Sequence, residues 1–203
     1  MPTLFSYVVD HDHGFAPNPY SHYCTLVHCK FGGSSGRRSI VEMAKVGDWI
    51  VGTGGRSKKS SGTGTVLYLM RVDEKLPFWK FLSDKRFRGR PDCVDLGRGN
   101  KFALVSQNYF YFGRHALKTS RLPAEIARKE LVKTGPGFRR DYPSAPLKRL
   151  VAWFGSHFEI GMHGDPCAVR TTQAKSRGQR NAKKKIRGND RGGGCDATSS
   201  IAR

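Results

Sequence analysis

The segment DHDH, residues 10 to 13, places two carboxylates and two imidazoles directly after a strand-like run. Such groups can hold a divalent cation, and a carboxylate among them can act as a general base. Alternation along an extended chain puts Asp10 with Asp12 on one side and His11 with His13 on the other. Asp12 is therefore a candidate catalytic residue or ligand, and a polar exit from a strand is the structural alternative.

The next segment, GFAPNPY at residues 14 to 20, is predicted to be a rigid loop. Pro17 and Pro19 fix their own φ angles and hold Ala16 and Asn18 in extended conformations, so no helix forms here. An asparagine held between two prolines can present its amide to the edge of a nucleobase. Asn18 is therefore a candidate base-pocket residue, and a simple turn former is the alternative.

Three potential metal ligands, Cys24, His28 and Cys29, lie in the run YCTLVHCKF, residues 23 to 31. In an extended strand Cys24 and His28 share a face while Cys29 points away, and no second ligand pair completes a four-coordinate site. We therefore predict no metal centre. The five cysteines are an odd number at irregular spacing, which favours reduced thiols over disulfides. Cys24 is kept as a possible nucleophile.

A Gly-Asp turn opens the apolar run in KVGDWIVGTG, residues 45 to 54. One interpretation is architectural: Gly47 supplies the turn, Asp48 bonds to the backbone and Trp49 packs in the core. The other is that Asp48 and Trp49 belong to a base pocket, where a flat ring stacks on the indole.

The run QNYFYFGRH, residues 107 to 115, has aromatic side chains at every position from 109 to 112. Alternation puts Tyr109 and Tyr111 on one face and Phe110 and Phe112 on the other. One face is predicted to be core. The tyrosine face is either a stacking surface or the second side of an ordinary amphipathic strand.

The chain is strongly basic, with 36 Lys and Arg against 16 Asp and Glu and a formal net charge of +20. Residues 170 to 203 have 10 Lys or Arg, 2 Asp and almost no large apolar residues, so we expect a disordered basic tail there. The domain at residues 1 to 169 keeps a net charge of +12. Such a field attracts phosphodiester backbones, and the expected partner is nucleic acid, DNA in particular.

Basic side chains also occur where they could contact phosphates individually. The loop GGRSKKSSGTG, residues 54 to 64, offers Lys58 and Lys59 on a glycine-rich backbone, and Arg114 follows the aromatic run. The loop lacks the spacing of a nucleotide P-loop. A solvated hairpin loop is the alternative.

The hydrophobic pattern predicts strands first and helices late. Runs rich in β-branched and aromatic residues occupy residues 3–9, 23–31, 48–54, 64–73, 101–106 and 109–113. Helices are predicted at residues 77–87, 122–133 and 146–156. This order predicts an α+β fold with a mostly antiparallel curved sheet, or a small barrel, and about three helices.

Several classes of protein are disfavoured. No run of about 18 apolar residues is present, so we expect no membrane-spanning segment. The first residues lack the pattern of a secretory signal, and we expect a cytoplasmic protein. No spacing typical of a known catalytic motif occurs, so whether the protein is an enzyme stays open.

The blocks SYVVDHDHGFAPNPY, CTLVHCK, VGDWIVGTG, VLYLMRVDE and ALVSQNYFYFG resemble the nucleotide-modification-associated domain family, second type. The resemblance covers residues 3 to about 165. It implies a bacterial or phage domain of systems that make, or respond to, modified bases in DNA. The segment DCVDLGRGNK, residues 92 to 101, departs from the acidic block expected there. The positions that match the family pattern are Asp12, Gly14, Asn18, Pro19, Cys24, Gly47, Asp48, Trp49, Ser106 and Tyr111.

The Gly-Asp turn is also similar to that of PUA-like domains, which bind RNA or modified bases in an aromatic pocket, so the barrel could be PUA-like. The leading hypothesis is a domain that recognises or processes modified bases in DNA, in which Asp12 and Cys24 adjoin a base pocket formed by Asn18, Asp48, Trp49, Ser106 and Tyr111. Two alternatives stay open: a nucleotide- or base-modifying enzyme that uses Asp12 and Cys24, and a non-specific basic DNA-binding accessory protein. No cofactor and no oligomeric state is assigned.

Overall fold

A computed structural model describes residues 1–28, 38–97, 99–124, 126, 131, 133, 135 and 137–168. The predicted basic tail, Cys29 and half of the predicted helix at 122–133 lie outside these residues. Within them, no helix is long and apolar enough to cross a membrane.

The larger sheet contains most of the strands that the sequence predicts. Its strands are β1 (Leu4–Val9), β3 (Trp49–Gly54), β4 (Thr65–Arg71), β7 (Tyr109–Tyr111), β8 (Leu117–Lys118), β9 (Phe138–Arg139) and β10 (Gly161–Met162). The order is β10-β7-β4-β3-β1-β9, and β8 pairs with β4 beside this path. β1 runs parallel to β3 and β10 parallel to β7, while the remaining pairs are antiparallel.

A second, antiparallel sheet has the order β2-β6-β5. Its strands are β2 (Cys24–Leu26), β6 (Phe102–Ser106) and β5 (Glu74–Pro77). The α-helices are α1 (Ile40–Met43), α2 (Phe78–Ser83) and α4 (Ser144–His157), and the 3-10 turns are η1 (Lys85–Phe87), η2 (Gly113–His115) and η3 (Thr119–Arg121).

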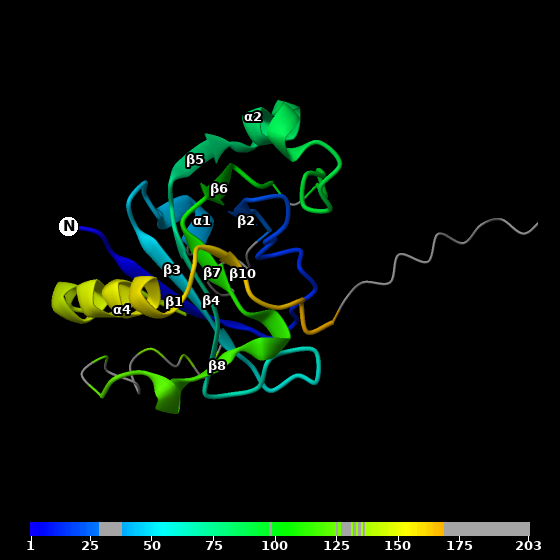
Figure 1. The fold of residues 1–203 in the computed structure, drawn as a ribbon. Coiled ribbons are helices and arrows are strands. Elements are labelled where there is room, and N and C mark those ends of the chain that lie inside the picture. Colours follow the sequence, from blue (N-terminus) through cyan, green and yellow to red (C-terminus); the bar gives the residue numbers. More distant parts are fainter. Residues whose placement is uncertain are drawn as a thin grey trace, which may run out of the picture. The chain divides into compact units, whose positions relative to one another are not determined.

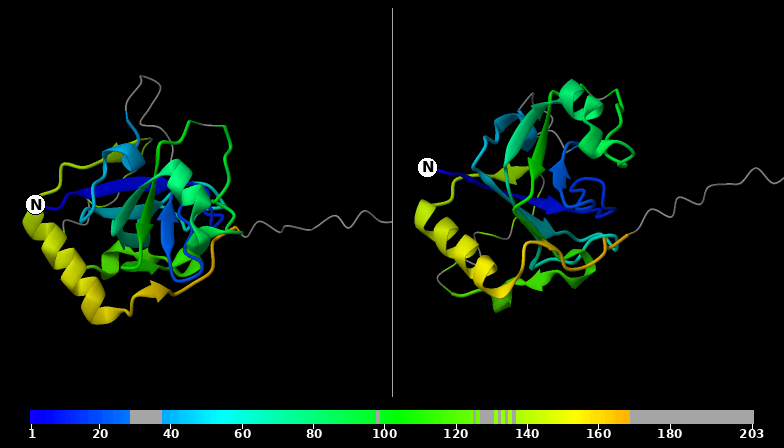
Figure 2. Two further views of the ribbon diagram at one scale, coloured as in Figure 1. Left: turned by 90° about the horizontal axis from the view of Figure 1, so that it is seen from above. Right: turned by 45° about the horizontal axis from the view of Figure 1, so that its top comes forward.

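The elements stack in four layers, with α4, the larger sheet, the smaller sheet and α2 in succession (Figure 1). The right-hand view of Figure 2 keeps α2 and α4 on opposite sides of the sheets. One core fills the space between the two sheets, a second lies between the larger sheet and α4, and a third lies beneath α2. The central strands β1, β3, β4 and β7 are therefore mostly buried on both faces.

β7 illustrates this burial on both faces. The predicted alternation is confirmed: Tyr109 and Tyr111 face the core between the sheets, and Phe110 faces the core under α4. Both tyrosine side chains are buried. The tyrosine face is thus core and offers no open stacking surface.

The α+β class agrees with the sequence. α2 and α4 confirm the helices predicted at 77–87 and 146–156, whereas α1 was not predicted and the sheet prediction was wrong in part. The larger sheet is mixed, because two of its six strand pairs are parallel, and the described strands form no closed barrel. The reason is that β1 and β3 are joined through β2 and α1, a connection long enough for parallel pairing. The larger and the smaller sheet pack face to face with one core between them and do not close into a barrel.

Candidate functional site

Asp12 lies in the turn that follows β1 and is almost completely buried, with 1% of its surface exposed. Its Oδ1 accepts a hydrogen bond from the Tyr111 hydroxyl at 2.6 Å and a longer one from the Gly14 N–H at 3.4 Å. Its Oδ2 accepts from the Cys167 N–H at 2.9 Å. Both oxygens are therefore engaged within the protein, and they fasten the turn to β7 and to the segment after β10.

The surroundings of Asp12 raise the pKa values of several neighbours. Burial raises the pKa of Tyr111 far above its ordinary value, and the adjacent Asp12 carboxylate adds to the effect. Burial and Asp12 also raise the pKa of Cys167 to about 12. The Tyr20 pKa is raised by burial, with Asp165 and Asp12 contributing. These groups stay protonated near neutral pH, which suits a hydrogen-bonded anchor.

Asn18 is fully buried, and its amide bonds inside the protein. Its Nδ2 donates to Asp92 Oδ1 at 2.7 Å, and its Oδ1 accepts from Arg90 Nη2 at 2.9 Å and from the Tyr20 N–H at 3.2 Å. Its backbone pairs with Thr25 of β2. The Asn18 amide was predicted to contact a base edge, but in the structure it bonds to Asp92, Arg90 and Tyr20 and holds the proline loop in place.

Arg90 and Asp92 form a buried ion pair that the sequence reasoning missed. Their side chains are 4% and 0% exposed, and Arg90 Nε lies 3.4 Å from Asp92 Oδ1. Arg90 also donates to the Asn18 carbonyl, to Thr25 Oγ1 and to the Tyr20 carbonyl, and Thr25 donates to Asp92 Oδ2. The segment RPD carries no periodic pattern, so only the folded loop shows that these charges face inward.

Cys24 lies in β2 between the two sheets and is fully buried. Its thiol contacts the Met70 sulfur at 3.8 Å, and burial raises its pKa well above the ordinary value. A nucleophilic cysteine needs an accessible thiolate. The position of Cys24 therefore suits packing better than covalent catalysis.

The Gly-Asp turn adopts the architectural arrangement. Gly47 has a φ of +92°, which favours glycine, and Asp48 accepts from the Thr3 N–H and from the Lys45 N–H, both at 2.8 Å. Trp49 packs against the core under α4. Asp48 is therefore fully used in fixing the start of β3.

The predicted residues do not surround a single pocket, because β1 and β3 are parallel. Leu4 pairs with Trp49 and Val9 with Gly54, so Trp49 lies at the beginning of the strands and Asp12 lies beyond their end. Five residues of strand correspond to about 16 Å. Asp12 and Trp49 thus belong to opposite ends of the larger sheet.

At the Trp49 end there is an open cavity of about 600 Å³, which we name the Trp49 groove. Ser106 lies nearby but is buried, where its hydroxyl donates to the Asn108 carbonyl at 3.0 Å and to Asp73 Oδ2 at 3.5 Å. Ser106 therefore helps to hold Asn108 and Asp73 in position. The groove is lined by Trp49, Arg71, Asn108, Phe110, Val151, Gly155, Phe158, Glu159 and Ile160.

All three predicted phosphate-binding residues, Lys58, Lys59 and Arg114, lie at the Asp12 end of the larger sheet. All three side chains are exposed. The Lys59 carbonyl accepts from the Asp12 N–H at 2.9 Å, and the Arg114 N–H donates to the Asp165 carbonyl at 2.8 Å, two residues before Cys167. We name these three cations the basic rim.

The loop between β3 and β4 that carries two of these cations is folded against the strand ends. Ser60 Oγ donates to the Val9 carbonyl at 2.6 Å and accepts from the Gly55 N–H at 2.7 Å, and the Ser57 N–H donates to Asp10 Oδ1 at 3.2 Å. Figure 1 shows this loop and the segment after β10 on the same, right-hand side of the larger sheet. The backbone therefore presents the lysines in a defined place.

No group of three or more potential metal ligands occurs among the described residues. In the DHDH segment the His11 and His13 rings are stacked with centroids 6.2 Å apart, as alternation predicts. His13 Nδ1 lies 2.7 Å from the Ala168 carbonyl oxygen, and Asp12 is occupied as described above. The segment serves as a polar turn within the described structure.

Comparison with protein families gives a match to nucleotide modification associated domain 2 over residues 1–95 and 90–173. The two matched segments meet at residues 90–95, where the sequence suggested a departure from the family pattern. No curated protein and no solved structure matches the chain. Since the matched segments together cover most of its length, the chain belongs to the nucleotide modification associated domain 2 family.

Proposed function

We propose that this protein binds DNA and recognises or processes a modified base in it. The family description refers to nucleotide modification, which supports a modified nucleotide as the target. The observation that carries the proposal is the basic rim, where three exposed cations from two distant segments of the sequence lie at one end of the larger sheet.

Charge supports a polyanionic partner. The whole chain has a formal net charge of +20, and the one ion pair found within the rim, Arg114 with Asp165, spans 3.6 Å between half-exposed groups. Exposed pairs of this kind are weak, so the guanidinium can exchange its carboxylate for a phosphate at little cost. Lys58 and Lys59 have exposed side chains above a backbone that is already hydrogen-bonded.

Recognition is favoured over covalent catalysis by the state of the two residues that the enzyme alternative uses. The Cys24 thiol is buried and its pKa is raised, and both Asp12 oxygens accept hydrogen bonds from the protein. A base-reading protein needs neither group to be free.

The test is a salt titration of DNA binding by the full chain and by a triple variant, Lys58→Gln, Lys59→Gln and Arg114→Gln. The slope of log K against log salt concentration is negative, and each lost phosphate contact should reduce its magnitude by about 0.9 for duplex DNA. The matched control removes three exposed cations from the region of α2 and η1, by Lys80→Gln, Lys85→Gln and Arg88→Gln. An equal change in both variants would mean that only total charge matters.

The same proteins should be measured on matched oligonucleotides with unmodified and hypermodified bases at two salt concentrations. A preference for the modified base that persists at the higher salt concentration supports recognition, because phosphate contacts weaken there. Equal binding that salt abolishes would leave a non-specific accessory protein. Stronger binding to matched RNA would overturn the assignment to DNA.

A further inference from the structure

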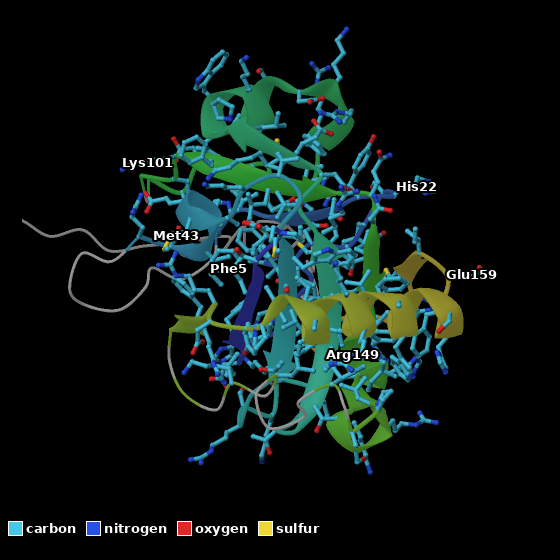
Figure 3. The ribbon with its side chains drawn as sticks, turned by 90° about the vertical axis from the view of Figure 1, so that its left-hand side faces the viewer. Phe5, His22, Met43, Lys101, Arg149 and Glu159 are labelled. Carbon is cyan, nitrogen blue, oxygen red and sulfur yellow. The ribbon has the colours of Figure 1, made fainter. Side chains whose placement is uncertain are left out.

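The Trp49 groove is a second feature with the dimensions of a ligand site. Its volume of about 600 Å³ lies within the ~300–1,000 Å³ typical of small-molecule sites. The beginning of β3, the end of β4 and the start of β7 form one side, and the C-terminal half of α4 with the residues after it forms the other. Figure 3 shows Glu159 at the C-terminal end of α4, beyond Arg149.

One wall of the groove is apolar and aromatic. Trp49 is partly exposed, and the other apolar side chains of the lining are Phe110, Val151, Phe158 and Ile160. A planar heteroaromatic ring can stack on an exposed indole, and every nucleobase has such a face. The wall is therefore suited to a flat ring more than to a flexible chain.

The polar groups of the groove are held by Asp73. Asp73 Oδ2 accepts from the Asn108 N–H and from Asn108 Nδ2, both at 3.1 Å, which leaves the amide oxygen and the second N–H of that side chain for a ligand. Asp73 Oδ1 lies 3.7 Å from Arg71 Nη1, and the Arg71 side chain is 48% exposed. The guanidinium thus has donors directed to solvent as well as to Asp73.

The lining therefore combines a stacking ring, an amide oxygen and a cation. A nucleotide has the complementary parts: a flat base, exocyclic N–H donors and a phosphate. Glu159 supplies a second acceptor at the other side of the groove. A purely apolar ligand would form no hydrogen bond or ion pair with Arg71, Asn108 or Glu159.

We infer that the Trp49 groove binds a nucleotide, with the base against Trp49 and the phosphate at Arg71. This inference rests on the proposed function and specifies where the base is read. The groove and the basic rim are separated by about 16 Å along β3. A stacked strand rises about 3.4 Å per nucleotide, so the two sites contact positions about five nucleotides apart.

The nucleotide can be free or part of a DNA strand, and both present the same chemistry to the groove. The experiment therefore uses two kinds of probe with the full chain, namely deoxynucleoside monophosphates with unmodified or 5-hydroxymethylated pyrimidines, and single-stranded decamers with one such base. Deoxyribose 5-phosphate, which has no base, and the nucleosides, which have no phosphate, test the two halves of the ligand. Binding is measured by calorimetry.

The variants are Trp49→Leu and Arg71→Gln, with Trp79→Leu and Arg149→Gln as matched controls. Trp79 is 67% exposed and Arg149 is exposed on α4, and neither lines the groove. We expect Trp49→Leu to weaken nucleotide binding by about 5- to 150-fold, since stacking is worth that much per base. Arg71→Gln should weaken it about tenfold for nucleotides and leave nucleosides unchanged, and the controls should bind normally.

Trp49 also packs in the core, so Trp49→Phe is included in case the leucine variant fails to fold. The inference is overturned if Arg71→Gln binds nucleotides like the wild type, if a folded Trp49→Leu does so, or if deoxyribose 5-phosphate binds as tightly as the nucleotides. Trp49→Phe keeps a smaller stacking face and should bind between the wild type and Trp49→Leu. It is also overturned if Trp49→Leu changes only the oligomeric state, because the groove is then occupied by a second copy.

The two proposals fail in different ways. Loss of DNA binding in the basic-rim variant with unchanged Trp49 and Arg71 variants would refute the groove and leave the proposed function standing. Binding of mononucleotides that depends on Trp49, in a protein whose DNA binding ignores the basic rim, would refute the DNA interface and identify the free nucleotide as the ligand.

Discussion

The buried ion pair of Arg90 and Asp92 gives the most direct test of the structure. Replacing Asp92 by alanine removes the carboxylate that faces Arg90, while the arginine stays in place with 4% of its side chain exposed. The replacement also takes away the acceptor for Asn18 Nδ2 at 2.7 Å and the acceptor for Thr25 Oγ1. A buried guanidinium and two donors then lose their anionic partner at once.

The expected loss of unfolding free energy in Asp92→Ala follows from these missing partners. Removal of one member of a buried ion pair costs about 3–5 kcal/mol, because the remaining charge has neither water nor a counter-ion. For a domain of this size each kcal/mol corresponds to about 2–4 °C in the melting temperature, so Asp92→Ala should lower it by about 6–20 °C. Asp92→Asn keeps the shape and one acceptor, and should cost less.

The assay is urea and thermal unfolding followed by circular dichroism, with an exposed ion pair as control. Glu74 accepts two hydrogen bonds from Arg86, at 2.6 and 2.9 Å, but both side chains are 36% exposed. Glu74→Ala should therefore cost about 1 kcal/mol or less. A loss below 1 kcal/mol for Asp92→Ala, or equal losses for both variants, would refute the placement of Arg90 and Asp92 in the interior.

Three further predictions concern groups near the Asp12 end and the core between the sheets. Tyr111→Phe removes the 2.6 Å hydrogen bond to Asp12 and should lower the free energy of unfolding in urea by about 1.5–3 kcal/mol. Tyr109→Phe loses a 3.0 Å hydrogen bond to a neutral carbonyl and should lower it by about 0.5–1.5 kcal/mol. Equal losses would contradict a carboxylate acceptor for Tyr111. Burial raises the pKa of Tyr109 and of Cys167 to about 12, from 10.0 and 9.0, so the folded state keeps protons that the unfolded state releases. These two groups should therefore leave stability unchanged between neutral pH and about pH 9 and lower it as pH rises towards 12, by up to about 1.4 kcal/mol per pH unit for each group. Urea midpoints that rise from about pH 9 to 12 would show the opposite sign. Cys24 should resist a thiol reagent at pH 8 in the native protein and react after unfolding, and rapid labelling that Cys24→Ser abolishes would show an accessible thiolate.

Local pattern was sufficient to predict the long strands and the face that each side chain takes. The alternation of β7 assigned Tyr109 and Phe110 to opposite faces correctly, because a strand buried on both sides still has a period of two. Gly47 and Asp48 followed turn chemistry that lies within a few residues. The short helix α1 was missed although its capping box is readable, with Ser39 as N-cap and Glu42 three residues later.

The short strands β8, β9 and β10 were not predictable from local pattern. Each has only two residues, and each forms because a distant strand offers free backbone groups. β9, for example, pairs Phe138 with Tyr7. Two residues cannot show a period, so pairing and not propensity decides such elements.

For the candidate site too, residue types predicted some features and the fold decided the others. Asp12, Asn18, Cys24 and Trp49 were chosen for their residue types, and the structure shows that three of them are buried and bonded within the protein while Trp49 remains partly exposed. The charged residue types predicted a basic surface, and the fold then gathered Lys58, Lys59 and Arg114 at one end. Arg90 and Asp92 could not be found in advance, since the sequence gives charge but not the direction a loop side chain takes.

By itself the sequence determined the α+β class, the strands that form the core, the family and the net positive charge. These properties depend on composition and on spacings of a few residues, which are already complete in the unfolded chain. The tertiary structure alone decided the parallel pairing of β1 with β3, which sends Asp12 and Trp49 to opposite ends of one sheet. Strand direction depends on contacts between residues more than 40 positions apart, and that is why one predicted pocket became a basic rim and a separate groove.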